Sequence, residues 1–195
     1  QRAYDQLIHD VAVQNLDVTF ALDRSGLVGE DGPTHSGNYD IAYLRCIPNM
    51  VICTPSDENE TRKLLTTAYL HNGPASVRYP RGTGPNSNVD KDLKPLKIGE
   101  ANIINEESSE IVILNFGTLL NEANQISKEL RATLVDMRFV KPLDEKLLRK
   151  LFKKAKVFIS IEDGSIMGGA GSAVQEFASK AVSYTHLTLP TSSRV

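Results

Sequence analysis

Apolar and polar residues alternate along this chain in blocks that predict a series of helices and strands. Residues 3–14 repeat apolar positions at helical spacing and predict an amphipathic helix, and 18–22 form a short apolar run typical of a buried strand. The glycine-rich stretch 24–38 predicts a long polar loop. The next expected elements are a short helix near 39–45, a strand at 50–54, a helix capped by Ser56 that ends near residue 71, and a strand at 75–79.

Residues 83–98 are rich in glycine, proline and asparagine, and this composition predicts a linker between two domains, 1–82 and 99–182. Beyond the linker, strands and helices alternate, and this alternation predicts crossover connections and a parallel sheet covered by helices. We therefore expect an α/β protein with two domains whose mainly parallel sheets are flanked by helices. The elements expected after the linker are strands at 111–116, 133–137 and 157–161, and helices at 119–130, 144–154 and 169–181.

Charge and cysteine content narrow the function classes. The chain has 22 Lys and Arg against 24 Asp and Glu, a formal net charge of −2, so it lacks the basic excess of a nucleic-acid-binding protein. It shows neither an apolar run long enough to span a bilayer nor a signal peptide, and we expect a cytoplasmic protein without a membrane partner. Cys46 and Cys53 have no companion ligands, so we expect two plain buried thiols and no metal site.

The loop that follows the first predicted strand carries the residues best suited to chemistry. Arg24, Asp31 and His35 supply a cation, a carboxylate and an imidazole at the carboxyl end of a strand, where ligands of parallel sheets bind. This set suits an anionic substrate that undergoes proton transfer. The glycine spacing alone favours a solvated loop whose polar groups satisfy its own turns.

Arg78 and Arg81 flank a Tyr-Pro pair at the end of another predicted strand, and together they can present guanidinium groups to a phosphate or carboxylate. A structural ion pair with the chain's own carboxylates explains them equally well. Two further motifs, 136–144 and 162–172, favour structure over catalysis. The first is a strand exit with Asp144 as a helix cap, and the second has the small residues that let a helix pack tightly on a sheet or on another subunit.

Several of these segments, in this order, resemble the 1-deoxy-D-xylulose-5-phosphate synthase family of the transketolase superfamily over residues 1 to about 182. Gly-Glu-Asp-Gly-Pro-Thr-His, 29–35, is shared widely among transketolases, whereas Asp-Arg-Ser-Gly-Leu-Val, 23–28, and Tyr-Pro-Arg-Gly, 79–82, select the synthase. The resemblance implies part of a pyrimidine-binding domain in 1–82 and a transketolase C-terminal domain in 99–182. It also implies a homodimer.

The same resemblance implies a thiamine-diphosphate- and Mg²⁺-dependent transferase that joins pyruvate to D-glyceraldehyde 3-phosphate with loss of CO₂, for isoprenoid, thiamine and pyridoxal synthesis. Matched residue by residue, Arg24 and Arg81 correspond to arginines that hold the acceptor's phosphate, and Arg2 to a basic residue of the substrate pocket. Asp31 and His35 correspond to the polar pair beside the reacting carbons. For His35, proton transfer and substrate orientation both stay open.

The chain also departs from the family. The residues that bind thiamine diphosphate and Mg²⁺ are expected before Gln1, so no residue here is a cofactor ligand and the chain alone is expected to be inactive. Residues 183–195 do not follow the family pattern, and we interpret them as an aberrant tail whose His186 has no catalytic role. The alternatives are another thiamine-diphosphate enzyme, either transketolase or the β subunit of a 2-oxo acid dehydrogenase, and a non-catalytic dimerisation module.

Overall fold

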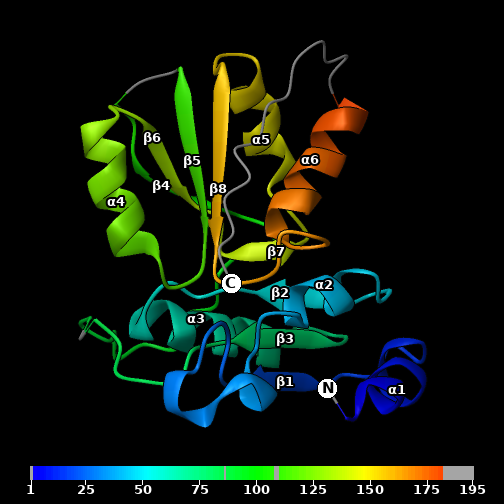
Figure 1. Cartoon of the computed structure of the whole chain (residues 1–195). Helices are drawn as coiled ribbons and strands as arrows, with labels where there is room; N and C mark the ends of the chain where they lie inside the picture. The colour runs from blue at the N-terminus through cyan, green and yellow to red at the C-terminus, as the bar shows by residue number, and fades with distance from the viewer. Residues whose placement is uncertain (1, 86, 108–109, 182–195) are drawn as a thin grey trace.

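The computed structural model describes residues 2–85, 87–107 and 110–181, and these form two four-stranded sheets with helices against them (Figure 1). The α/β architecture with two mainly parallel sheets is as predicted. In each sheet three strands are parallel and one edge strand is antiparallel. The second sheet stands above the first, and the carboxyl ends of its parallel strands point down towards it.

The first sheet has the order β1-β3-β2-β7. Its strands are short. Strands β2 and β3 are buried, as their apolar runs predict. The prediction of a buried strand at 18–22 was wrong, because β1 lies at the edge of the sheet and is only partly buried, with Ala21 exposed. The members are β1 (Thr19–Leu22), β3 (Ala75–Arg78), β2 (Val51–Cys53) and β7 (Phe139–Lys141). The last of these was not predicted, because three residues carry no periodicity, and it comes from the C-terminal half of the sequence. Phe139 completes the small core between α3 and the first sheet.

The helices of the first half follow the prediction closely. They are α1 (Tyr4–Gln6), which continues as a π-helix (Leu7–Ala12), α2 (Asp40–Arg45) and α3 (Glu58–Tyr69). The N-cap prediction for α3 was wrong by one residue. The side chain of Asp57, not Ser56, accepts the backbone N–H of Glu60 at 2.8 Å, because Ser56 donates its hydroxyl to the buried Asp136 at 2.8 Å.

The second sheet has the order β4-β6-β5-β8, and α4 covers one face while α5 and α6 cover the other (Figure 1). Asp144 caps α5 as predicted, by accepting the N–H of Leu147 at 2.9 Å. The exposed edge strand β4 was not predicted. The bounds are β4 (Asn102–Asn105), β5 (Ile111–Phe116), α4 (Leu120–Glu129), β6 (Thr133–Asp136), α5 (Glu145–Phe152), β8 (Val157–Glu162) and α6 (Ala170–Ala181).

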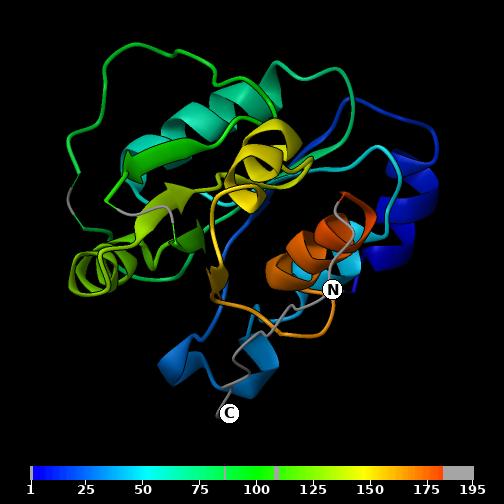
Figure 2. The same cartoon turned by 90° about the horizontal axis from the view of Figure 1, so that it is seen from above.

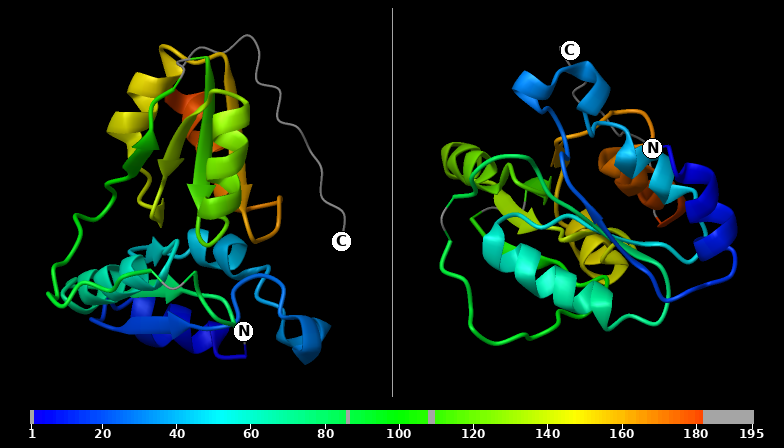
Figure 3. Two further views of the ribbon diagram at one scale, coloured as in Figure 1. Left: turned by 90° about the vertical axis from the view of Figure 1, so that its left-hand side faces the viewer. Right: turned by 90° about the horizontal axis from the view of Figure 1, so that it is seen from below.

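One apolar core runs through both halves. It joins Ile41 and Leu44 of α2 to Leu114 of β5, Met137 and Phe177 of α6. Between the sheets the chain follows the outside of the molecule, as the green segment in Figure 3 shows. This segment packs on α3 through hydrogen bonds such as Leu96 N–H to Thr67 Oγ1 at 2.7 Å. The two halves are therefore held together by side chains as well as by the chain itself.

Three sequence expectations concern thiols, membranes and the tail. Cys53 is buried, and burial raises its pKa to about 12, whereas Cys46 is exposed, so the prediction of two buried thiols was wrong for Cys46. Its position at the end of the short helix α2 leaves the sulfur at the surface. No helix in the described part of the chain is long and apolar enough to cross a membrane. The predicted aberrant tail, 183–195 with His186, lies outside the described residues.

Candidate functional site

The candidate site lies where β1 and β3 end side by side. These strands are parallel neighbours with Leu22 opposite Arg78, so the residues that follow them emerge at the same edge of the sheet. Ser25 N–H donates to the carbonyl of Tyr79 at 3.0 Å and ties the two exits together. Beyond this point the loop 24–38 forms two short 3₁₀ turns, Gly29–Asp31 and Pro33–His35, which project from the body of the molecule (Figure 2).

Arg24 and Arg81 converge on one carboxylate. Arg24 donates from Nε to Asp31 Oδ2 at 2.9 Å and from Nη1 to Asp23 Oδ2 at 2.5 Å, and Arg81 Nη1 donates to Asp31 Oδ1. The hydrogen bond from Arg24 and the charge of Arg81 lower the pKa of Asp31, so this carboxyl group is ionised at neutral pH. The structure thus brings three of the predicted site residues together, from two strand ends.

The two arginines of this cluster have N–H groups that remain available to a ligand. Nη2 of Arg24 and both Nε and Nη2 of Arg81 donate to no residue in the described part of the chain. The side chains of Arg24 and Arg81 are 38% and 45% exposed, so a solute can reach them. Two guanidinium groups oriented by a shared carboxylate and open to solvent can bind a phosphate through several charge-assisted hydrogen bonds.

His35 and Arg2 stand apart from the cluster. His35 is exposed, and its Nδ1 lies 3.0 Å from Thr34 Oγ1. It follows Asp31 by one 3₁₀ turn, so it belongs to the same loop, but no hydrogen bond or ion pair joins its ring to either arginine. Arg2 is exposed and forms no hydrogen bond or ion pair with the described residues. The structure therefore brings Arg24, Asp31 and Arg81 together, but it gives no contact that joins His35 or Arg2 to them.

Arg78 has a structural role. Its side chain is 3% exposed, and Nε donates to Asp40 Oδ2 at 2.7 Å. Nη2 donates to two carbonyls, Gly37 O at 3.2 Å and Asp163 O at 2.9 Å. Of the two explanations that the sequence left open, an internal ion pair holds for Arg78, because none of its charge is available at the surface.

The backbone N–H groups at the start of α6 already bind a carboxylate of the chain itself. Glu162 accepts the N–H groups of Ala170 at 2.7 Å and Gly171 at 2.9 Å, which are the amides that could otherwise hold an anion. Burial raises the pKa of Glu162, and these two hydrogen bonds oppose the rise. A Cβ on Gly171 would lie 2.5 Å from Ser160 Oγ, so the prediction of tight packing between helix and sheet is confirmed.

A buried polar junction connects the two sheets. Asp136, at the end of β6, is 1% exposed and accepts hydrogen bonds from Ser56 Oγ at 2.8 Å and Arg138 N at 3.3 Å. Arg138 in turn donates to both carboxylate oxygens of Glu60, at 2.7 and 3.0 Å. Burial raises the pKa of Asp136 to about 7. The predicted structural role of this motif agrees with the burial of Asp136.

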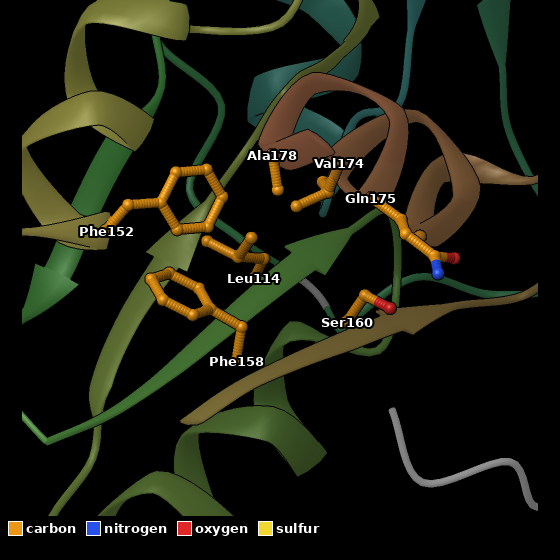
Figure 4. A pocket seen from close by; sticks show the side chains of 8 residues that line it. Leu114, Phe152, Phe158, Ser160, Val174, Gln175 and Ala178 are labelled. Carbon is orange, nitrogen blue, oxygen red and sulfur yellow. The ribbon is translucent and has the colours of Figure 1, made fainter. Parts of the chain in front are cut away.

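Two other features bear on ligands. The pocket in Figure 4 lies between α5, α6 and the second sheet, and Phe152, Phe158 and Val174 give it an apolar lining that does not suit a phosphorylated substrate. In the described ranges, no group of three His, Cys, Asp or Glu side chains is placed to hold a metal ion. The residues present therefore do not fit a Mg²⁺-diphosphate site.

Comparison with known proteins identifies the family. Residues 1–86 match the transketolase pyrimidine-binding domain, and residues 99–193 match the transketolase C-terminal domain. The chain belongs to the transketolase family. This transketolase-type chain is 61% identical over 193 residues to a protein of Pseudomonas putida strain GB-1 that is named 1-deoxy-D-xylulose-5-phosphate synthase. Synthases of the same name from Stutzerimonas stutzeri strain A1501 and Pseudomonas fluorescens strain Pf0-1 are 60% and 58% identical.

These matches include 97% of the transketolase-type chain but only 30% of the length of each synthase. Among solved structures, it is similar to the protein described as "Split gene transketolase, inactive beta4 tetramer". The two share 27% sequence identity with a TM-score of 0.82, over 92% of this chain and 59% of the other. Both the fold and the family are therefore shared with transketolases.

Sequence reasoning missed two residues that shape the site. Asp40 binds the buried Arg78, and Asp163 contacts the loop 24–38 from the other half of the chain. Asp40 follows a tyrosine at the start of a helix and carries no local signal of a long-range pair. Asp163 sits in a motif that resembles an ordinary strand-to-helix turn. Only the folded arrangement shows their partners.

Proposed function

We propose that this chain carries the acceptor-binding region of a 1-deoxy-D-xylulose-5-phosphate synthase, which joins pyruvate to D-glyceraldehyde 3-phosphate and releases CO₂. The name of the relatives that are about 60% identical supports the choice of enzyme. The chain spans about a third of those relatives, so the reaction, substrates and homodimeric state are proposed for the complete protein. We propose domains at 1–82 and 99–182 with a linker at 83–98, and a cytoplasmic location.

The convergence of Arg24 and Arg81 on Asp31 is the observation that carries the proposal. Two cations from neighbouring strand ends reach the same pair of oxygens, and each retains N–H groups that have no partner among the described residues. A phosphate dianion can accept those free donors while Asp31 keeps the guanidinium planes oriented. An unphosphorylated aldehyde has no group of matching charge, so this cluster selects a phosphorylated acceptor.

Asp31 and His35 are the proposed catalytic residues beside the phosphate-binding arginines. The ionised Asp31 orients both guanidinium groups and presents negative charge near the acceptor's hydroxyl groups. His35 lies on the same loop with an exposed ring that can transfer a proton or orient a hydroxyl. Arg2 stays a candidate for the substrate pocket on sequence grounds only.

Thiamine diphosphate, with Mg²⁺, is the proposed cofactor because the relatives belong to the transketolase family, and when bound it would supply the electron-accepting group of the reaction. The described residues do not fit its metal-diphosphate part, so we assign no cofactor contact to them. Their proposed tasks are to bind the acceptor's phosphate and to handle protons on the acceptor. The chain alone is proposed to be inactive.

A chimeric enzyme tests the proposal. Residues 1–181 of this chain replace the matching segment of the Pseudomonas putida synthase, which is 61% identical, and product is measured from pyruvate and D-glyceraldehyde 3-phosphate. We expect a pentulose 5-phosphate formed with one CO₂ per turnover. Arg24→Ala should lower kcat/KM for the phosphorylated aldehyde more than tenfold and change kcat/KM for unphosphorylated D-glyceraldehyde less than threefold.

Arg149→Ala is the matched control, because Arg149 is also a partly exposed, ion-paired arginine, but it lies on α5 in the other half. It should leave both substrates unaffected. A chimera that makes only ketose transfer products would indicate transketolase activity, and acyl transfer without an aldehyde acceptor would indicate a 2-oxo acid dehydrogenase. Equal losses for both aldehydes in Arg24→Ala would rule out a phosphate-binding role.

A self-associating module without activity is the second candidate, and one observation favours it. The solved relative at TM-score 0.82 is described as an inactive tetramer of one polypeptide from a split-gene transketolase. Light scattering of the purified chain, combined with the product assay, separates the two functions. An inactive oligomer, together with an active chimera that tolerates both Arg24→Ala and His35→Ala, would favour the module.

A further inference from the structure

Arg24 is held in a backbone conformation that it does not prefer. Its φ is +58°, in the left-handed region that residues with a Cβ rarely adopt. Such a conformation persists only where neighbouring contacts fix the chain on both sides. On one side Arg24 leaves β1, which is locked in the sheet. The contacts of the next three residues therefore help to fix the backbone from which its side chain extends.

Backbone hydrogen bonds fix these three residues. Ser25 N–H donates to Tyr79 O at 3.0 Å, and Gly26 and Gly37 exchange two bonds, at 3.2 and 2.9 Å. The backbone N–H of Leu27 stabilises the ionised form of the Asp163 side chain, which lies between β8 and α6. The three hydrogen bonds come from the pyrimidine-binding half of the chain, whereas Asp163 comes from the C-terminal half.

The Asp163 carboxylate also occupies the space above Gly26. A Cβ built on Gly26 would lie 1.8 Å from Asp163 Oδ2, so the carboxylate is in contact with the glycine backbone. Gly26 itself has a φ of +77°. Two separate features therefore require a glycine at position 26: the positive φ of its backbone and the close approach of the Asp163 carboxylate.

Residues near Asp163 also attach the segment between β8 and α6 to the loop 24–38. Ser165 N–H donates to Asn38 O at 2.9 Å, and the buried Arg78 donates from Nη2 to both Asp163 O and Gly37 O. The two ends of the loop, near Gly26 and near Gly37, are therefore both fastened to Asp163, one directly and one through Arg78. No other segment of the described C-terminal half is bonded in this way to the loop.

We propose that Asp163 is a positioning residue through which the C-terminal domain holds the loop 24–38, so that Arg24 faces the acceptor's phosphate. Asp163 does not touch the substrate. It binds Leu27 N–H and packs on Gly26, and so stabilises the left-handed Arg24 that precedes them. The inference rests on the proposed function for its substrate, but the link between Asp163 and the loop is a property of the protein itself.

Hydrogen exchange tests the link without any substrate. In the chimeric enzyme, Asp163→Ala removes the acceptor for Leu27 N–H, and the amides of residues 25–27 should exchange at least tenfold faster than in the unmodified chimera. Asp163→Asn retains an oxygen that can accept this bond and should stay within threefold. Asp92→Ala is the control, because Asp92 is an exposed, ion-paired carboxylate in the segment between the sheets.

Kinetics then test the consequence for substrate binding. Asp163→Ala should raise KM for D-glyceraldehyde 3-phosphate at least fivefold, leave KM for pyruvate within twofold and change kcat by less than threefold. Asp163→Asn should restore KM for the phosphorylated aldehyde to within threefold of the unmodified chimera. A residue that only stabilised the fold would affect both substrates alike, and its effect would not depend on the retained oxygen.

The two proposals fail in different ways. Unchanged exchange at residues 25–27 in Asp163→Ala overturns the positioning role, even in a chimera that makes the expected product. A chimera that makes no pentulose 5-phosphate overturns the proposed function, while the exchange measurement still decides the positioning role. Faster exchange with an unchanged KM for the phosphorylated aldehyde shows that the link exists but does not position Arg24, and this also overturns the inference.

Discussion

Arg78 and Arg81 lie three residues apart in one short motif, yet their surroundings differ in kind. Arg78 is 3% exposed and is bonded to Asp40, Gly37 and Asp163, whereas Arg81 is 45% exposed and, among the residues that the structure describes, is bonded to Asp31 alone. Arg78 thus joins three segments of the protein, and Arg81 keeps donors for a ligand. The comparison teaches that burial and the number of internal partners, more than residue type, separate a structural arginine from a binding one.

Replacing Arg78 should have the largest effect on stability. Arg78→Ala leaves the Asp40 carboxylate buried without its partner, and breaking such a pair costs about 3–5 kcal/mol of unfolding free energy. Urea denaturation of the purified chain measures the loss. A variant with nearly unchanged stability would mean that water replaces the guanidinium group, and the contrast with Arg81 would then disappear.

Gly26→Ala should come next, because the new Cβ meets the Asp163 carboxylate and also strains a positive φ. Together we expect a loss of about 1–3 kcal/mol in unfolding free energy, measured by the same denaturation experiment. Gly29→Ala separates the two causes, since Gly29 has a φ of +58° but open space around it. Equal losses in the two variants would mean that contact with Asp163 contributes nothing.

The buried junction between the sheets should give a pH-dependent effect. Burial raises the folded-state pKa of Asp136 from 3.8 to about 7, so the folded protein retains a proton that the unfolded chain has released. Unfolding free energy should therefore fall as pH rises from about 4 to 7, by at most about 1.4 kcal/mol per pH unit for this one proton. Below pH 4 and above pH 7 the contribution is constant.

Asp136→Asn should remove this part of the pH dependence, because the amide stays neutral beside Ser56, Glu60 and Arg138. Denaturation at pH 5 and pH 8 provides the measurement, and the stability gained by the variant relative to the original protein should be larger at pH 8 than at pH 5. Asp144→Asn, at an N-cap outside the junction, is the control. Equal slopes in the original and Asp136→Asn proteins would contradict the raised pKa.

The smallest effect on stability is expected for Arg81→Ala. Its ion pair with Asp31 is open to water, and exposed pairs contribute little to folding. The urea midpoint should stay within experimental error of the original protein, while 10-fold excess inorganic phosphate should no longer protect residues 24–31 from hydrogen exchange. A clear drop in the midpoint would place Arg81 in the same structural class as Arg78.

The regular elements could be predicted because their periodicity is local. The helix predicted to follow Ser56 and end near 71 and the strands at 75–79 and 111–116 match α3, β3 and β5 within two residues at each end. Strand β7 could not be predicted in the same way, since Phe139–Lys141 becomes a strand only by pairing with β2, some ninety residues earlier in the chain. The N-cap of α3 depended on Asp136, which takes the Ser56 hydroxyl.

The site was predictable in part for the same reason. Arg24, Asp31 and Arg81 follow strand ends, and parallel strands bring such ends together. The roles of Asp40 and Asp163 depend on contacts across the fold, and no local pattern distinguishes these acids from the chain's others. Arg78 and Arg81 were indistinguishable in sequence, because their exposure is set by which side of the chain faces the second sheet.

Strand β7 has a consequence for how this gene can be cut and recombined. Phe139–Lys141 belongs to the C-terminal half in sequence but to the first sheet in space. A gene split or crossover within the codons for 83–98 would supply β2 with a foreign neighbour or with none. The bared amides of β2 would then form an open edge of the kind that recruits other chains into aggregates.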